Sequence, residues 1–110
     1  MQTNNIYSLY DRKAQYYLPL FAMRSDADAI RQFAVIVSTS DTPVSQYPAD
    51  YDLVRLGSID LESGLINPEY PCGIVINGLV ALQNAQVERS RYKAALSQQV
   101  DIEEFIAENP

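Results

Sequence analysis

The order of hydrophobic and polar positions predicts a β-hairpin at the start of the chain. Residues 6–10 are rich in tyrosine and aliphatic side chains, residues 11–14 form a polar break, and residues 15–23 resume an aromatic and aliphatic run. Two such runs joined by a short polar segment are typical of a hairpin. Pro19 cannot donate to a ladder, so the second strand should lie at an edge or carry a bulge.

A helix is predicted next, over residues 26–37. Ser25 and Asp28 have the spacing of an N-terminal capping pair. The polar stretch at residues 38–43 should end the helix. Its apolar face recurs at helical spacing and consists of Ala27, Ile30, Phe33, Ala34 and Val37.

A second hairpin is predicted after a proline-containing loop. Residues 51–59 alternate between apolar and polar side chains, residues 60–64 can turn, and residues 65–66 begin a returning strand. We expect Pro68 and Pro71 to end that strand, because neither can donate a ladder hydrogen bond.

The last third of the chain is expected to be largely helical. Residues 72–82 fit either a buried strand or the start of a helix, residues 87–99 predict a helix, and residues 101–108 place apolar side chains at helical spacing among four acids. The fold class is therefore α+β: two β-hairpins forming a small antiparallel sheet, one packed helix, and a C-terminal helical segment. We expect a core domain over residues 1–82 and a helical extension over residues 83–110, used for oligomerisation or partner docking.

Composition limits the chemistry that the chain can perform. It has 110 residues, of which 47% are hydrophobic, enough for one domain with a core. It has no histidine and a single cysteine, Cys72, so a zinc site of three Cys or His ligands, an internal disulfide and a Ser-His or Cys-His pair are excluded. Asp50, Asp52 and Asp60 offer carboxylates for Mg²⁺, but no phosphate-binding glycine loop or base accompanies them, so solvated surface acids are the favoured interpretation. We expect no enzyme activity, no cofactor and no metal.

The chain shows no targeting pattern. Residues 1–5 are polar and uncharged, unlike a signal peptide. The longest apolar run, residues 73–82, contains Asn77 and is too short to cross a bilayer. We therefore expect a cytoplasmic protein without a membrane partner.

Aromatic and basic side chains gather near the N-terminus. Residues 1–24 hold four of the eight tyrosines and carry three basic side chains against one acidic side chain, a balance of +2. Rings stack on bases and cations follow phosphates, so this pattern is typical of a groove for single-stranded nucleic acid. The alternative, a hairpin whose tyrosines are half-buried against a core, is the favoured interpretation on spacing alone. The candidate nucleic-acid-binding residues are Tyr7, Tyr10, Arg12, Lys13, Tyr16, Tyr17, Arg24 and Arg31.

The overall charge argues against strong binding to duplex DNA. The net charge is −6, and residues 41–86 carry one basic side chain against six acidic ones, a balance of −5. Phosphate neutralisation supplies most non-specific DNA affinity. Binding through the N-terminal residues should therefore be weak and salt-sensitive, unless the protein oligomerises and combines several such surfaces.

Two further features lie near the C-terminus. A second cationic and aromatic cluster could bind phosphate, although a solvated helix face is the favoured interpretation; it consists of Arg89, Arg91, Tyr92 and Lys93. The apolar positions of the acidic last segment either pack on the core or a second subunit, or dock into a groove of a partner. Together with an edge strand, this segment predicts a homodimer or higher oligomer. The candidate partner-binding residues are Ile102, Phe105 and Ile106.

Several segments together resemble one protein family. They are Tyr7-Ser8-Leu9-Tyr10-Asp11-Arg12-Lys13-Ala14, Tyr17-Leu18-Pro19-Leu20-Phe21, Ala29-Ile30-Arg31-Gln32-Phe33, Tyr47-Pro48-Ala49-Asp50-Tyr51-Asp52-Leu53, and Leu56-Gly57-Ser58-Ile59-Asp60 with Gly64. In this order, over residues 6–76, the pattern is similar to the small non-structural protein of gokushovirus-type phages, in the single-stranded DNA family Microviridae. The resemblance does not extend to residues 83–110.

The resemblance implies a DNA-binding accessory protein of phage genome replication or packaging. Such a protein is proposed to favour the synthesis of single-stranded genomes over further duplex replication, in the host cytoplasm and not in the virion. We therefore expect a non-enzymatic protein that binds single-stranded DNA. The alternative is an adaptor that engages a host or phage replication or assembly protein through its acidic surface and tail.

Overall fold

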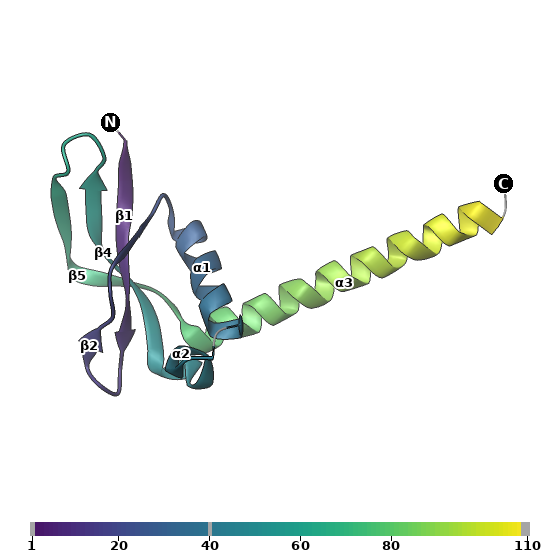
Figure 1. Ribbon diagram of the computed structural model, residues 1–110, viewed down its shortest axis with the longest axis horizontal. Helices are drawn as coiled ribbons and strands as arrows, with labels where there is room; N and C mark the ends of the chain where they lie inside the picture. Colours follow the sequence, from purple (N-terminus) through teal and green to yellow (C-terminus); the bar gives the residue numbers. More distant parts are fainter. Residues whose placement is uncertain (1, 40, 109–110) are drawn as a thin grey trace.

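The computed structural model shows a small antiparallel sheet with helices on one side and one long helix leading away from it (Figure 1). It describes residues 2–39 and 41–108, with side chains described through residue 98. The α+β class is confirmed. The elements are β1 (Thr3–Asp11), β2 (Tyr16–Tyr17), β3 (Phe21–Met23), α1 (Asp26–Thr39), α2 (Pro43–Gln46), the 3-10 turn η1 (Pro48–Asp50), β4 (Tyr51–Asp60), β5 (Ile66–Asn77) and α3 (Gly78–Glu108).

The first predicted hairpin is confirmed. The sheet runs in the order β2-β1-β4-β5, and β3 also pairs with β1, so β2 and β3 together form one edge. Pro19 lies between β2 and β3, at that edge, where no ladder hydrogen bond is required of it. The turn after β1 is held by the Asp11 carboxylate, which accepts hydrogen bonds from the backbone N–H groups of Lys13 and Ala14 at 2.9 and 3.0 Å.

The second hairpin is also present, but the prediction that Pro68 and Pro71 end its returning strand is wrong. β5 continues to Asn77, pairing with β4 over most of its length. Prolines are tolerated because β5 is the outer strand of the described sheet, so one of its edges has no ladder partner. Between the pairs Arg55–Gly73 and Gly57–Pro68 the register shifts, and residues 69–72 bulge outward opposite a single β4 residue.

Helix α1 agrees with the helix predicted over residues 26–37 and covers one face of the sheet (Figure 1). The backbone N–H of Asp28 donates to Ser25 Oγ at 3.2 Å, as the capping pattern indicates. Ala27 is exposed, however, and Ala29 takes its place on the packed face. The buried hydrophobic core lies between α1, the sheet and the start of α3 and consists of Tyr7, Leu9, Ala29, Phe33, Val37, Val44, Tyr51, Leu53 and Ala81.

The ambiguous residues 72–82 are divided between two elements, because β5 ends at Asn77 and α3 begins at Gly78. An added Cβ at Gly78 would collide with the carbonyl oxygen of Pro48, so the helix starts in close contact with η1. From there α3 runs without a break to Glu108, through the predicted domain boundary at residues 82–83.

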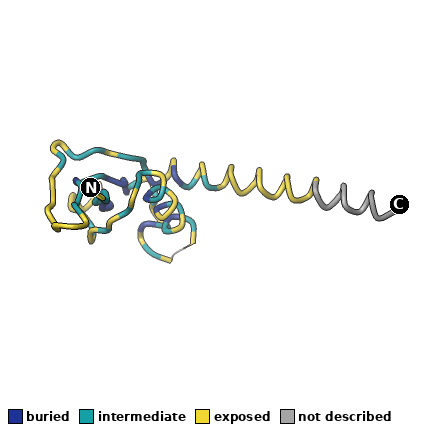
Figure 2. Tube along the Cα trace, turned by 90° about the horizontal axis from the view of Figure 1, so that it is seen from above, coloured by how far each residue is buried: buried dark blue, intermediate teal, exposed yellow. Residues whose placement is uncertain are grey.

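Among the α3 residues whose side chains are described, only those of the first turns are buried or partly buried. Ala81 is buried, Leu82 and Ala85 are partly buried, and residues 86–98 are exposed (Figure 2). The side chains of Ile102, Phe105 and Ile106 lie outside the described residues. Among residues 2–39 and 41–108, no helix is long and apolar enough to cross a membrane.

Candidate nucleic-acid interface

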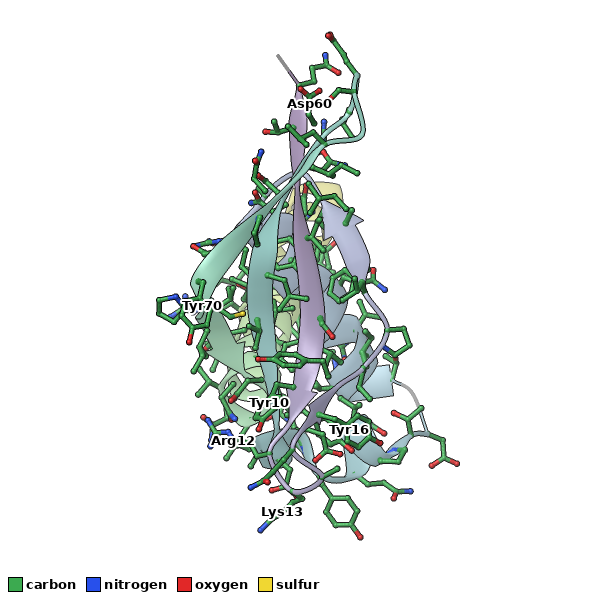
Figure 3. All side chains as sticks on the ribbon, turned by 90° about the vertical axis from the view of Figure 1, so that its left-hand side faces the viewer. Tyr10, Arg12, Lys13, Tyr16, Asp60 and Tyr70 are labelled. Carbon is green, nitrogen blue, oxygen red and sulfur yellow. The ribbon has the colours of Figure 1, made fainter. Side chains whose placement is uncertain are left out.

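In the part of the chain that the structure describes, no helix covers one of the two faces of the sheet (Figure 1). Along β1, Tyr7 and Leu9 point to the core beneath α1, and strand alternation places Ser8 and Tyr10 on the opposite face. Figure 3 views this uncovered face, which we call the open face, with Tyr10 and Arg12 near one end and Asp60 near the other. The rings of Tyr10 and Tyr17 are cross-strand neighbours there, with centroids 4.9 Å apart.

A hollow of about 500 Å³ lies on the open face, a volume in the range of small-molecule sites. Tyr70 at its rim is 95% exposed and Ile74 is 68% exposed. Burial raises the pKa of Tyr17, and the neighbouring Cys72 thiol raises that pKa further. The lining is mainly aromatic and aliphatic and consists of Tyr10, Arg12, Tyr17, Asp52, Val54, Tyr70, Pro71, Cys72 and Ile74.

Arg12 is fixed at this hollow by a bidentate ion pair. Its Nε and Nη2 donate to the two carboxylate oxygens of Asp52 at 2.8 and 3.0 Å, and the hydrogen bonds raise the pKa of Arg12. Asp52 also accepts a hydrogen bond from Asn77 Nδ2 at 2.9 Å. The Arg12 side chain is 53% exposed and that of Asp52 only 4%. The guanidinium is therefore positioned and reachable, but its charge is offset by a carboxylate beneath it.

The structure divides the eight predicted nucleic-acid residues among three places. Tyr10, Arg12 and Tyr17 meet at the hollow, and Lys13 is exposed at the turn after β1 (Figure 3). Tyr16 is exposed at the same turn, but strand alternation directs its side chain to the face opposite that of Tyr17. The other three lie away from the open face, one in the core and two on the helical side: Tyr7, Arg24 and Arg31.

The expectation that Tyr7 stacks on bases is wrong, because its ring is fully buried. Its hydroxyl donates to Asp26 Oδ1 at 2.5 Å and accepts from Asn5 Nδ2 at 3.0 Å. Burial, reinforced by the bond to Asp26, raises the pKa of Tyr7 to about 12. Tyr7 therefore follows the alternative interpretation, a strand tyrosine that packs in the core.

Asp26 belongs to a structural network with Arg55 and Glu69. Arg55 donates to Asp26 Oδ2 at 2.6 Å and to the two oxygens of Glu69 at 3.0 Å each. The hydrogen bond from Tyr7 is the main reason that the pKa of Asp26 is lowered, and the hydrogen bond from Arg55 lowers the pKa of Glu69. These contacts tie the start of α1 to β1, β4 and the bulge of β5.

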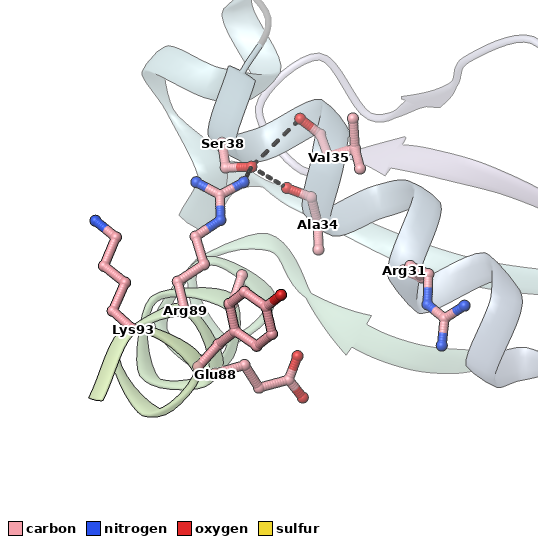
Figure 4. Close-up of a pocket in the computed structure, with 9 residues that line it drawn as sticks. Arg31, Ala34, Val35, Ser38, Glu88, Arg89 and Lys93 are labelled. Carbon is pink, nitrogen blue, oxygen red and sulfur yellow. Dashed lines mark hydrogen bonds between the residues drawn. The ribbon is translucent and has the colours of Figure 1, made fainter. Parts of the chain in front are cut away.

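Arg24 and Arg31 do not join the open face. The Arg24 side chain is 87% exposed and lies 3.9 Å from the Asp28 carboxylate. Arg31 lines a groove between α1 and α3 together with Arg89 and Lys93 (Figure 4). The fold thus brings Arg31 to the second cationic cluster, a proximity that the sequence analysis did not predict.

Strand β5 also contributes residues to the open face, which the sequence pattern did not predict. Pro68 and Pro71 were expected to end the returning strand, and residues 72–82 fitted either a buried strand or the start of a helix. Tyr70, Cys72 and Ile74 were therefore not placed on the open face. The available signal was the apolar, β-branched run Ile74-Val75-Ile76 soon after Pro71, which favours a strand that continues past a bulge.

The three carboxylates considered for Mg²⁺ do not come together. Asp52 and Asp60 are eight positions apart along the extended strand β4, roughly 26 Å. Asp52 is hydrogen-bonded to Arg12, and Asp60 accepts hydrogen bonds from the backbone N–H groups of Glu62 and Ser63 in the β4–β5 turn. Within the described part of the chain, no three His, Cys, Asp or Glu side chains are grouped for a metal ion.

Comparison with known proteins places the chain in a family. Residues 4–82 match the family described as Phage ORF5 protein. The chain is 36% identical over 83 residues to Protein ORF5 of Chlamydia phage 1, an alignment that covers 72% of this chain and 80% of that protein. No solved structure matches. The resemblance to a gokushovirus-type phage protein is thereby confirmed: the chain belongs to the Phage ORF5 protein family.

Proposed function

We propose that this phage protein binds single-stranded DNA on the open face of its sheet. The observation that carries the proposal is the hollow flanked by Tyr10, Tyr17 and Tyr70, on a face that none of the described helices covers. Bases stack on exposed rings for about 1–3 kcal/mol each, independently of sequence. Antiparallel sheets with exposed aromatic side chains bind single-stranded RNA in the same way, by displaying rings to unpaired bases.

Electrostatics favours a single strand over a duplex. In the open face Asp52 offsets Arg12, which leaves Lys13 as the nearby cation, on a chain with a net charge of −6. A duplex hides its bases and must be bound mainly through its phosphates. A single strand offers its bases to the tyrosines, so stacking supplies the affinity that the charge does not.

Exposed tyrosines allow a test without disturbing the core. Tyr17→Ala and Tyr70→Ala alter side chains that are 47% and 95% exposed, and Tyr47→Ala is the matched control because Tyr47 is 61% exposed and does not line the hollow. Each open-face variant should bind a single strand roughly 5- to 150-fold more weakly, the equivalent of one lost stack. Fluorescence anisotropy measures this; wild-type affinity in both open-face variants would overturn the site.

A role in replication follows from covering the strand. A bound single strand is a poorer template, so the protein would favour single-stranded genomes over further duplex synthesis. Primer extension on a circular single-stranded template should slow with the wild-type protein and recover with Tyr70→Ala. We place this activity in the host cytoplasm, and purified virions should then lack the protein. Neither a cofactor nor a catalytic group is needed.

A second candidate function is protein docking through α3. The helix continues past residue 82, where the family match ends, and its side chains are exposed over residues 86–98. A helix exposed all round is stabilised by a partner more than by propensity. We propose that it pairs with a second copy or with a replication or assembly protein. Light scattering on the full chain and on a chain lacking residues 99–110 tests pairing with a second copy, and a pull-down of phage and host replication proteins tests docking. A monomer mass for both chains, together with no captured protein, would refute a docking role for α3.

A further inference from the structure

The groove between α1 and α3 has the composition of a second nucleotide site. Arg31 lies on its α1 side, and Arg89 and Lys93 lie on its α3 side (Figure 4). The space encloses about 480 Å³. Its floor is made of small or aliphatic side chains, Ala34, Val35 and Ala85, and the ring of Tyr92, 67% exposed, also lines it.

We infer that this groove is a second contact for single-stranded DNA, in which the cations hold phosphates and Tyr92 and the apolar floor hold a base. The inference rests on the proposed function, since it names another surface for the same ligand. It assigns a role to cations that the open face does not use.

The groove carries unpaired positive charge. Arg31, Arg89 and Lys93 face one acidic lining residue, Glu88, which leaves a balance of +2 on a chain whose net charge is −6. In the part of the chain that the structure describes, these three cations have no carboxylate within 4.0 Å; Arg89 instead approaches Ser38 Oγ at 3.5 Å. Arg12 and Arg55, by contrast, are both paired with carboxylates.

The spacing on α3 explains why two of the three cations share one side of that helix. Arg89 and Lys93 are four residues apart, so they lie on the same side of the helix. Arg91 is rotated by about half a turn from this side and lies apart from the groove lining, although it is on the same helix. A phosphate chain bound in the groove would contact the first two and not the third.

Charge complementarity selects the ligand. The cations are reachable, and the floor between them is apolar, which suits a ligand with a charged backbone and a flat apolar part. A single strand has both, whereas the bases of a duplex are not available to Tyr92. An acidic protein segment is the competing occupant, and a groove used for it alone would leave DNA binding by Arg89→Ala/Lys93→Ala at the wild-type level.

The test compares Arg89→Ala/Lys93→Ala with Arg91→Ala, which removes a cation from the other side of the same helix. Anisotropy is measured on the full chain with a single strand of about 30 nucleotides at several salt concentrations. Losing two phosphate contacts should lower the slope of log K against log salt by about 1.4 and weaken binding roughly tenfold near 0.15 M salt. Arg91→Ala should change neither, and circular dichroism should show unchanged helix content in all variants.

Each outcome supports or refutes binding of single-stranded DNA in the groove. An equal loss in Arg91→Ala would show a general charge effect and overturn the groove. Wild-type binding by the double variant, with loss in Tyr17→Ala and Tyr70→Ala, would overturn the groove and leave the proposed function standing. Loss in the double variant alone would support the groove and refute the open face, and no binding by the wild type would refute both. Photo-cross-linking of a 5-bromodeoxyuridine strand should label the peptide that contains Tyr92; labelling elsewhere only would contradict the inference.

Discussion

Replacing Asp52 by asparagine should strengthen DNA binding while weakening the fold. Asp52 lies beneath Arg12, 4% exposed, and offsets its charge through two hydrogen bonds of 2.8 and 3.0 Å. Asparagine keeps the shape and one acceptor but removes the negative charge. Arg12 would then present a full positive charge to a phosphate at the hollow.

The size of the effect follows from Coulomb's law. A phosphate on the outer side of the Arg12 guanidinium would lie about 8 Å from the Asp52 carboxylate, where two unit charges repel by roughly 0.5 kcal/mol in water and roughly 2 kcal/mol at an effective dielectric constant of about 20. Asp52→Asn should therefore tighten binding to a single strand roughly two- to thirty-fold. The same change removes a hydrogen bond to a charged group and should cost roughly 1.5–3 kcal/mol of unfolding free energy.

Asp60→Asn is the matched control for Asp52→Asn. Asp60 lies at the other end of β4, and an asparagine there can still accept the backbone N–H groups of the turn (Figure 3). Anisotropy titrations and urea denaturation measure the two effects separately. If Asp52→Asn stays folded and binds no more tightly than wild type, or if Asp60→Asn tightens binding equally, Arg12 does not contact phosphate at the open face.

Two further predictions concern the fold. The folded-state pKa of Tyr7 is raised to about 12 from an ordinary 10, so its contribution to stability is complete below pH 10 and is lost as pH rises towards 12. The wild type should therefore lose roughly 2–3 kcal/mol of unfolding free energy over this pH range, and Tyr7→Phe should not. Equal alkaline denaturation curves for the two proteins would contradict the assignment. Gly57→Ala should destabilise the protein by roughly 1–3 kcal/mol, because the added Cβ collides with the carbonyl oxygen of Asn67 in β5. Gly73→Ala is the control, since the groups it would meet are the side-chain ends of Glu69 and Arg55; thermal unfolding should show the smaller loss there.

Local patterns were enough to predict the first hairpin, α1 and the β4 strand. The capping pair at Ser25 and Asp28 and the alternation in residues 51–59 are signals that act within a few residues. The predicted end of β5 was too early because a proline excludes a central strand but not an outer one. Which strand is outermost depends on the order of strands in the whole sheet, and local sequence does not give that order. The same outer prolines, Pro68 and Pro71, interrupt the free edge of β5 and make it a poor surface for pairing with a second copy.

The candidate site was predicted in part for a similar reason. Alternation puts Tyr7 and Tyr10 on opposite faces of β1, but only the position of α1 decides which face is covered. The grouping of Arg31 with Arg89 and Lys93 depends on how two helices far apart in sequence pack. Pattern reasoning therefore identified the chemistry of these side chains, whereas their assembly into two separate surfaces required the tertiary structure.

The most direct test of the central claim is to compare a labelled single strand of about 30 nucleotides with a duplex of equal length, by anisotropy, at low and at near-physiological salt. We predict tighter binding to the single strand at both salt concentrations, weaker at the higher one, and reduced by Tyr70→Ala but not by Tyr47→Ala. Equal or tighter binding to the duplex, or no binding to either at low salt, would contradict the claim that the open face holds unpaired bases.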